Sequence, residues 1–469
     1  MTKPVSRRGF IGGTAATGIG FAFAGSGSLE AFARPMAGSP LTATGYGPLV
    51  PDPNGLLSLP AGFSYRVLAQ SGVTVTEGGP YPSDPDGMGV FRRVQGGSIL
   101  VTNHENTRNE PHHVPVTEGL TFDPGAIGGT STLVVDEDGT VRRAYTSLAG
   151  TSTNCAGGIT PWGTWLTCEE HEGRKGEGNL NYTLDHGWVF EVDPSSREAN
   201  IDKSPVPLKF LGRYAHEAVA VDPRSGRIYL TEDAVTPNGL YYRWTPPSRF
   251  RPGPDALRKL ALSRGGATAG RLQAMSCFDG DRHVDDLSEA AAVGTTYRVR
   301  WVDVPDRLAS DVSVRKQFTA GQVTRSQKLE GQWWGRGGPY FVASFARTAA
   351  GSPRAHDGQV WFHDPASQTV TLTTTFGVNP APGVEGAFDG PDNITVSAHG
   401  GLILAEDGSG IQHLIGVTSA GDAYPLARNE HPAAGEFCGP AFSRDGRTLF
   451  ANVQFPGYTY AITGPWADG

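Results

Sequence analysis

Cysteine is scarce in this chain of 469 residues, because only four are present, at positions 155, 168, 277 and 438. Four cysteines are too few to form a disulfide framework in a protein of this length. Charged residues make up only 18% of the chain and the net charge is −8, so the basic excess typical of a nucleic-acid-binding protein is missing. Beyond the N-terminal region the sequence also lacks an apolar run of about 20 residues, the length that spans a membrane. We therefore expect neither nucleic-acid binding nor a stable membrane association.

Glycine and proline are abundant instead, with 64 and 35 residues, and hydrophobic residues make up 38% of the chain. This composition indicates a soluble, turn-rich protein that is long enough to bury a large core. The hydrophobic pattern favours β-strands over helices throughout. The sequence thus predicts an all-β fold.

One short stretch, HEAVAVDPRSGRIYLTEDA (residues 216–234), shows this β pattern closely. Two apolar runs flank the turn residues DPRSG, which predicts a tight β-hairpin. The first residue of one strand then lies beside the last residue of the other, so Glu217 is expected near Glu232 and Asp233. Carboxylates this close raise each other's pKa unless a cation lies between them. Taken alone, the hairpin allows either a solvated acidic rim or a metal site.

The end of this hairpin recurs along the chain. Three apolar residues followed by Thr or Ala occur in ILVTNHE (99–105), TWLTCEE (164–170), IYLTEDA (228–234), YFVASFA (340–346), LILAEDG (402–408) and TLFANVQ (448–454). A unit that recurs at irregular spacing favours radial repetition. A residue able to bind a metal precedes each copy by 12 to 16 positions, at the start of the expected partner strand: Asp86, Cys155, Glu217, Glu330, Asp392 and Glu436.

Six such units predict a six-bladed β-propeller. The innermost strands of a propeller line its central channel and run in the same direction, so their first residues converge on one mouth. Carboxylates and a thiolate gathered in one cavity require several bound cations to offset their charge. The repeats therefore favour the metal site over the solvated rim.

Other acidic and amide residues of the repeats are further candidates for this site. Asn393 follows Asp392 in the register of the proposed ligands, and Glu105 is a candidate calcium ligand. Glu406 and Asp407 repeat the positions of Glu232 and Asp233, either as ligands or as residues that hold ligands in place.

We expect residues 34–469 to form a single propeller domain. The spacing between the third and fourth repeats is the longest, so residues 246–325 are expected to be an insertion between blades 3 and 4, part helical around residues 255–262. The basic residues of this segment predict a solvated face rather than a binding surface.

The N-terminus has the pattern of a twin-arginine export signal. Ser-Arg-Arg-Gly-Phe-Ile at residues 6–11 precedes a weakly apolar, glycine-rich run, and Ala31-Phe32-Ala33 offers a cleavage site. Residues 1–33 are therefore expected to be a signal peptide read by the twin-arginine translocase. Because this route carries folded proteins, it suits a cofactor loaded before export to the periplasm, the cell envelope or the medium.

Cys155 allows two interpretations. It lies with Cys168 at the open end of one predicted hairpin, where the two could form a disulfide after export. It also stands where other repeats place carboxylates, as a thiolate ligand would. A thiolate among oxygen ligands favours a softer or redox metal such as iron beside hard cations.

The sequence resembles the PhoX-type alkaline phosphatases. The resemblance rests on NHE (103–105), NCAGGITPWGTWLTCEE (154–170), RYAHEAVAVDP with GRIYLTED (213–233), PDNITVSAHGGLILAEDG (391–408) and GPAFSRDGRTLFANVQFPG (439–457), together with the export signal. It implies a six-bladed propeller that holds a cluster of Fe³⁺ and Ca²⁺ and hydrolyses phosphate monoesters. The metal ligands it implies are Cys155, Glu170, Glu217, Glu330 and Asp392, with Glu169 as the alternative to Glu170.

Two positions depart from the family pattern. Lys328 stands where an arginine aimed at the substrate phosphate is expected, and it keeps the positive charge but loses the bidentate fork. Phe455 stands where histidine is commoner. We accordingly expect Glu330, Lys328 and Cys155 to carry catalysis, with a substrate preference that differs from the family's.

Two other functions stay open from the sequence. One is a calcium-dependent lactonase or phosphotriesterase propeller, which uses a ring of Glu, Asn and Asp around calcium without a thiolate. The other is an envelope propeller that binds metal and catalyses nothing.

Overall fold

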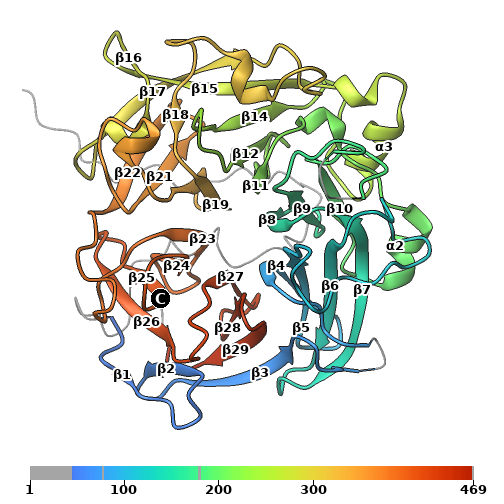
Figure 1. Cartoon of the computed structure of the whole chain (residues 1–469), viewed down its shortest axis with the longest axis vertical. Helices are drawn as coiled ribbons and strands as arrows, with labels where there is room; N and C mark the ends of the chain where they lie inside the picture. Colours follow the sequence, from blue (N-terminus) through green and yellow to red (C-terminus); the bar gives the residue numbers. More distant parts are fainter. Residues whose placement is uncertain (1–44, 77–78, 178–180, 467–469) are drawn as a thin grey trace, which may run out of the picture.

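The computed structural model describes residues 45–76, 79–177 and 181–466, and their strands surround a central axis (Figure 1). The predicted signal peptide, residues 1–33, lies outside the described residues. Helices are few: α2 (Arg197–Lys203), α3 (Ala256–Leu262) and the short 3₁₀ helices η1 (Lys209–Leu211), η2 (Gly266–Thr268), η3 (Leu287–Glu289), η4 (Val314–Gln317) and η5 (Thr348–Ala350). The fold is therefore all-β with a propeller-like arrangement. None of the helices in the described part is long and apolar enough to cross a membrane.

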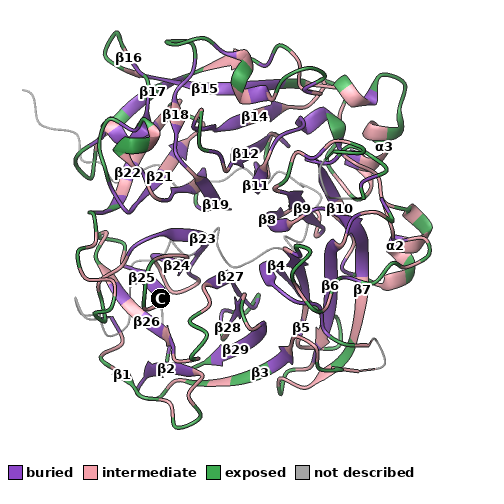
Figure 2. Ribbon diagram, viewed as in Figure 1, coloured by how far each residue is buried: buried purple, intermediate pink, exposed green. Residues whose placement is uncertain are grey.

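The innermost strands form a closed ring. Each contacts the next in chain order, and the last contacts the first. They are β4 (Pro85–Arg92), β8 (Asn154–Ile159), β11 (His216–Val221), β19 (Leu329–Trp334), β23 (Pro391–Val396) and β27 (Phe437–Phe442). All but one residue of β4 and one each of β8 and β19 are buried, which fits their position at the centre (Figure 2).

Two antiparallel sheets follow the first two inner strands. The first sheet has the order β4, β5 (Ser98–His104), β6 (Gly128–Val135) and β7 (Val141–Thr151). The second has the order β8, β9 (Trp165–Glu169) and β10 (Val189–Val192). Each predicted hairpin of this region is thus present, and its second strand ends at the mouth of the ring.

Chain segments from both ends build the last sheets. The strand β3 (Ser64–Gln70) pairs with β29 (Tyr458–Thr463), completing the sheet β27, β28 (Thr448–Val453), β29, β3. The neighbouring sheet runs from β23 through β24 (Leu402–Glu406), β25 (His413–Val417) and β26 (Ala423–Asn429) to β2 (Leu57–Pro60) and β1 (Leu49–Val50). Because the N-terminal strand β3 pairs with the C-terminal strand β29, the ring is closed by strand pairing between the two ends of the described chain.

One large sheet carries both β11 and β19. Its order is β11, β12 (Ile228–Glu232), β14 (Tyr242–Thr245), β15 (Arg271–Asp279), β17 (Thr296–Asp303), β22 (Thr369–Phe376), β21 (Gly358–Asp364), β20 (Pro339–Ala343) and β19, with β16 (Arg282–Val284) beside β15. A separate pair joins β13 (Gly239–Leu240) to β18 (Arg325–Ser326). Residues 246–325, expected to be an insertion, therefore supply strands that join two hairpins into one sheet. The helix expected around residues 255–262 is present as α3.

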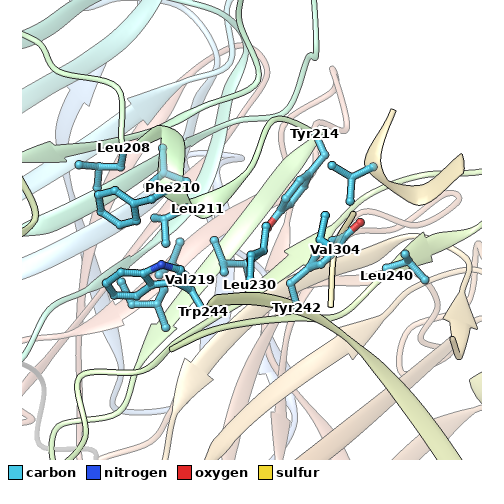
Figure 3. Close-up of a cluster of buried hydrophobic side chains, with 14 of the residues drawn as sticks. Leu208, Phe210, Leu211, Tyr214, Val219, Leu230, Leu240, Tyr242, Trp244 and Val304 are labelled. Atoms are coloured by element: carbon cyan, nitrogen blue, oxygen red, sulfur yellow. The ribbon is translucent and has the colours of Figure 1, made fainter. Parts of the chain in front are cut away.

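Large apolar side chains fill the spaces between neighbouring sheets. In one such cluster Val219 of β11 and Leu230 of β12 pack with Tyr214, Tyr242 and Trp244 (Figure 3). All five are at most 1% exposed. Burying one such side chain contributes roughly 1.5–3 kcal/mol. Leu166 of β9 and Val189 of β10 belong to the same cluster, so this part of the core lies between two neighbouring sheets.

Candidate metal centre

The second residue of every inner strand is acidic or a cysteine: Asp86, Cys155, Glu217, Glu330, Asp392 and Cys438. In each hairpin the pairing register shifts at or just after this residue. A β-bulge of this kind bends the strand and re-aims a side chain, and bulges are common beside active sites. The repeated bulge explains how six strands present one side chain each at the same level of the ring.

A second group of acids comes directly after the partner strands. Glu105 follows β5, Glu170 follows β9, Asp233 follows β12 and Asp407 follows β24. Successive side chains of a strand point to opposite sides. The last residue of each partner strand and the acid that directly follows it therefore point in opposite directions, so only one of the two can face the ring.

Nine of these side chains, all except Asp233, form a continuous acidic ring together with Glu436. Their ligand atoms lie within 4.8 Å of one another in five overlapping groups of three: Asp86, Glu105 and Cys155; Cys155, Glu170 and Glu217; Glu217, Glu330 and Asp392; Asp392, Asp407 and Glu436; and Glu436, Cys438 and Asp86. The structure thus brings together Cys155, Glu170, Glu217, Glu330, Asp392 and Glu105, all predicted from the sequence. We call these ten residues the acidic ring.

Glu169 does not join the acidic ring. Its Oε1 accepts hydrogen bonds from the backbone N–H of Ser152 and lies 2.6 Å from His186 Nδ1, while Oε2 accepts from the backbone N–H groups of Gly187 and Trp188. Both oxygens are committed to the protein, so the expectation that Glu169 could replace Glu170 as a ligand is corrected. Its position as the last residue of β9 explains the difference.

The same alternation distinguishes two other acidic pairs. Glu232 bonds to Tyr242 and Arg315, and Glu406 bonds to His413. His104 likewise bonds to Ser83 and Ser131 in the interior. These last strand residues hold the hairpin ends in place and do not offer ligands. By contrast, Asp407 belongs to the acidic ring, and Asp233 pairs with Lys328.

Cys438 was missed by the sequence analysis, which assigned Glu436 to the start of β27. Glu436 belongs to the acidic ring as well, but Cys438 occupies the position of Cys155 in its strand. The signal was present: Cys438 precedes Ala451 by 13 residues, within the spacing of the other repeats. All four cysteines are free and buried, so the disulfide between Cys155 and Cys168 is not formed.

Burial raises the pKa of every acidic-ring carboxyl that shows a resolved shift, and acidic neighbours raise it further for all of them except Asp86. Burial, and to a smaller extent the charge of Asp86, raises the pKa of Glu105 to about 8. Burial, and to a smaller extent the charge of Asp233, likewise raises the pKa of Glu330 to about 8. The pKa of Glu217 rises well above its ordinary value through burial and then Asp392. Burial also raises the pKa of the Cys155 and Cys438 thiols. In their charged forms these groups need added positive charge.

Lys328 is the cation nearest to these acids in the described part of the chain. Its Nζ lies 3.0 Å from Asp233 Oδ2 and 2.9 Å from Glu330 Oε1. Glu330 first, and then Asp233, raises the pKa of Lys328, which therefore stays protonated. One ammonium cannot offset eight carboxylates, so most of the negative charge is left uncompensated by side chains.

Asn393 supports the ring beside Asp392. Its Nδ2 donates to Asp392 Oδ1 at 3.0 Å, and its Oδ1 accepts from the backbone N–H of Gly439 at 2.6 Å. The amide thus links β23 to β27 and fixes the Asp392 carboxylate.

Small residues bring the inner strands close together next to the acids. A Cβ at Gly87 would lie 2.5 Å from Ala156 Cα, and a Cβ at Gly331 would lie 2.7 Å from Asn393 Cα. Neighbouring inner strands are therefore so close at these two positions that only glycine fits. The cavity at this level measures only about 20 Å³. Little space is therefore left between the inner strands next to the acidic ring.

The surroundings of the Glu217 carboxylate show whether these residues fit a metal cluster. It is fully buried, and neither of its carboxylate oxygens has a hydrogen-bond partner. Leaving a buried carboxylate unpaired costs several kcal/mol or more, and metal coordination is one of the few ways to satisfy it. Eight carboxylates suit hard cations such as Ca²⁺, and two thiols suit a softer metal. The donor set fits a cluster that contains both kinds of metal.

Comparison with known proteins agrees with this arrangement. The family model of the alkaline phosphatase PhoX matches residues 44–457. The structure of Pseudomonas fluorescens PhoX in complex with vanadate, a transition state analogue, is 18% identical, with a TM-score of 0.64 over 91% of this chain and 97% of that one. A gluconolactonase from Xanthomonas campestris is 13% identical and covers 89% of this chain and 98% of its own, with a TM-score of 0.39. No curated protein matches the chain. Because the family model spans most of its length, this protein belongs to the PhoX alkaline phosphatase family.

Proposed function

We propose that this phosphatase hydrolyses phosphate monoesters at a calcium and iron cluster bound by the acidic ring. The observation that carries the proposal is the ring itself, ten ligand-bearing side chains with successive atoms within 4.8 Å, which includes the unpartnered carboxylate of Glu217. The ligands we propose are the ten residues of the acidic ring. Asn393 and Lys328 act beside them.

The iron assignment rests on the two cysteines. Cys155 and Cys438 each belong to a group that also contains Asp86, so they lie on either side of one carboxylate. A thiolate ligand favours iron over calcium, and the all-oxygen group of Glu217, Glu330 and Asp392 favours calcium. A lactonase-type site with calcium alone would not need the two thiols.

When bound, the cations supply positive charge that neutralises the non-bridging oxygens of the phosphate as negative charge develops on them. Lys328 has three N–H donors and uses two on Asp233 and Glu330, so the third can be donated to the phosphate. Gln454 holds the carboxylates of Asp86 and Glu105 through Nε2 at 2.9 and 2.7 Å. The narrow space between the inner strands next to the ring favours an approach of substrate from the mouth.

We also propose six blades for the ring. The large sheet then counts as two blades, one built on β11 and one on β19, joined through β15 and β17. On this count, residues 246–325 would be the insertion between the third and fourth blades. The proposed domains are a signal peptide at residues 1–33 and a propeller at residues 34–469, exported by the twin-arginine translocase to the periplasm, envelope or medium.

The test is a substrate screen on metal-loaded protein. We expect release of phosphate from monoesters, and little from phosphodiesters, phosphotriesters or lactones. Glu217→Gln should abolish turnover and lower the metal content, whereas Glu137→Gln, in a turn away from the acidic ring, should change neither. Hydrolysis of lactones or triesters in preference to monoesters would contradict the proposal. Failure to hydrolyse any of these substrates would favour a non-catalytic metal-binding propeller.

A further inference from the structure

The connections between the second and third strands of the hairpin units differ in length around the ring. Each inner hairpin continues from its second strand into a connection at the mouth, and these connections span residues 105–127, 170–188, 233–241, 344–357, 407–412 and 454–457. The last one, between β28 and β29, is the shortest. Of these six connections, residues 454–457 therefore add the least chain at the mouth.

This short connection is held firmly above two parts of the acidic ring. The backbone N–H of Gln454 donates to the Glu436 carbonyl at 3.1 Å, while its side chain donates to Asp86 and Glu105. A Cβ at Gly435 would lie 1.9 Å from the Phe455 carbonyl oxygen, so the two backbones are in close contact. The position of residue 455 is thus fixed relative to the acids below it.

Phe455 is exposed in spite of this fixed position. Its side chain is 58% exposed, and it is the only exposed aromatic side chain in the described part of the chain. An aromatic ring held at the rim of a site offers a flat apolar face to a ligand at a small cost in conformational entropy.

We propose that Phe455 is a specificity-determining residue, which binds the alcohol part of the ester and favours substrates whose alcohol carries an aromatic ring. The inference rests on the proposed phosphatase function, because it places the phosphate at the acidic ring. The alcohol then projects toward the mouth, where Phe455 directly follows Gln454, whose side chain contacts two acids of the ring. Stacking on this ring stabilises aryl esters and contributes little to esters of small polar alcohols.

The experiment compares phenyl phosphate with ethyl phosphate on metal-loaded full-length protein. Phe455→Ala should lower kcat/KM for phenyl phosphate by about 2- to 13-fold, the range expected of one aromatic contact, mainly through KM. For ethyl phosphate the change should be smaller than twofold. Because each variant is compared with the wild type on the same ester, the different reactivities of the two alcohols cancel.

Three variants complete the test. Phe455→Trp should keep the wild-type preference for phenyl phosphate. Phe455→Leu should keep more of this preference than Phe455→Ala but less than Phe455→Trp, because the flat aromatic face is lost. Val94→Ala removes an apolar side chain that is 90% exposed in the turn between β4 and β5, far along the strands from the mouth, and should change neither ester. Equal losses for both esters in Phe455→Ala, or no loss for either, would overturn the inference while leaving the phosphatase function intact. A wild type that hydrolyses neither ester would instead refute the function on which the inference rests.

Discussion

Removing the metals should make the stability of this protein fall as the pH rises. In the metal-free protein, burial and acidic neighbours raise the pKa of Glu105 and Glu330 to about 8, and burial raises that of Asp86 to about 6. The folded state therefore keeps protons that the unfolded chain releases near its ordinary pKa of 4.5 for glutamate and 3.8 for aspartate. Stability is greatest below these ordinary values and is lost as the pH rises toward about 8.

Two estimates give the size of this loss. A rise in the pKa of one carboxyl from 4.5 to about 8 corresponds to roughly 5 kcal/mol of folding free energy. Two carboxylates 4.8 Å apart repel by about 3.5 kcal/mol at an effective dielectric constant of about 20. Because neighbouring acids share the same repulsion, their effects do not add. We therefore expect the free energy of unfolding to fall by about 3–5 kcal/mol between pH 5 and pH 8, a large part of the 5–15 kcal/mol typical of a domain.

The assay is denaturant unfolding of chelator-treated protein at several pH values in this range, followed by circular dichroism. Metal-loaded protein is the first control, and its stability should hold or rise with pH because metals bind the deprotonated ligands. Glu330→Gln is the second, and in the metal-free form it should weaken the pH dependence. A metal-free protein whose stability stays constant or increases between pH 5 and pH 8 would refute the reasoning that the acidic ring depends on cations.

Three further substitutions test individual residues. Cys155→Ser should lower the iron content and abolish activity, whereas Cys168→Ser should leave the iron content unchanged; full iron in Cys155→Ser would show that this thiol is not a ligand. Lys328→Met should raise KM for monoesters by about tenfold, as expected for one charge-assisted hydrogen bond, and should leave most of the metal bound; an unchanged KM would exclude its contact with phosphate. Arg315→Met should lower both stability and metal content, since Arg315 Nη1 lies 3.1 Å from Glu232 Oε1, next to Asp233; Arg315→Lys should restore part of both, and a fully stable, metal-loaded Arg315→Met would show that this ion pair does not support the site.

The sequence predicted the strands and most of the site because both follow the same repeat. Glu217, Glu330 and Asp392 stand at one position of equivalent hairpins, so finding one hairpin identified the others. The all-β fold follows from the same pattern, since apolar runs separated by turn residues recur along the chain.

The errors came from alternation at the strand ends, which spacing alone cannot resolve. Glu169 and Glu170 are adjacent and chemically identical, and only the end of β9 determines which of them faces the acidic ring. Cys438 was overlooked because an acid lies two positions before it, and the side chains of residues two apart point to the same side of a strand. Lys328 was expected to face the substrate phosphate; its ion pair with Asp233, which depends on contact between hairpins far apart in sequence, was not foreseen, although its second partner Glu330 lies only two residues away.

Anomalous diffraction from crystals of the natively exported protein tests the central claim most directly. Data collected on both sides of the iron absorption edge should show iron peaks beside the sulfur atoms of Cys155 and Cys438. Further metal density, without an iron signal, should lie among the carboxylates of Glu217, Glu330 and Asp392. An active enzyme whose crystals show no metal density within the acidic ring would contradict the account.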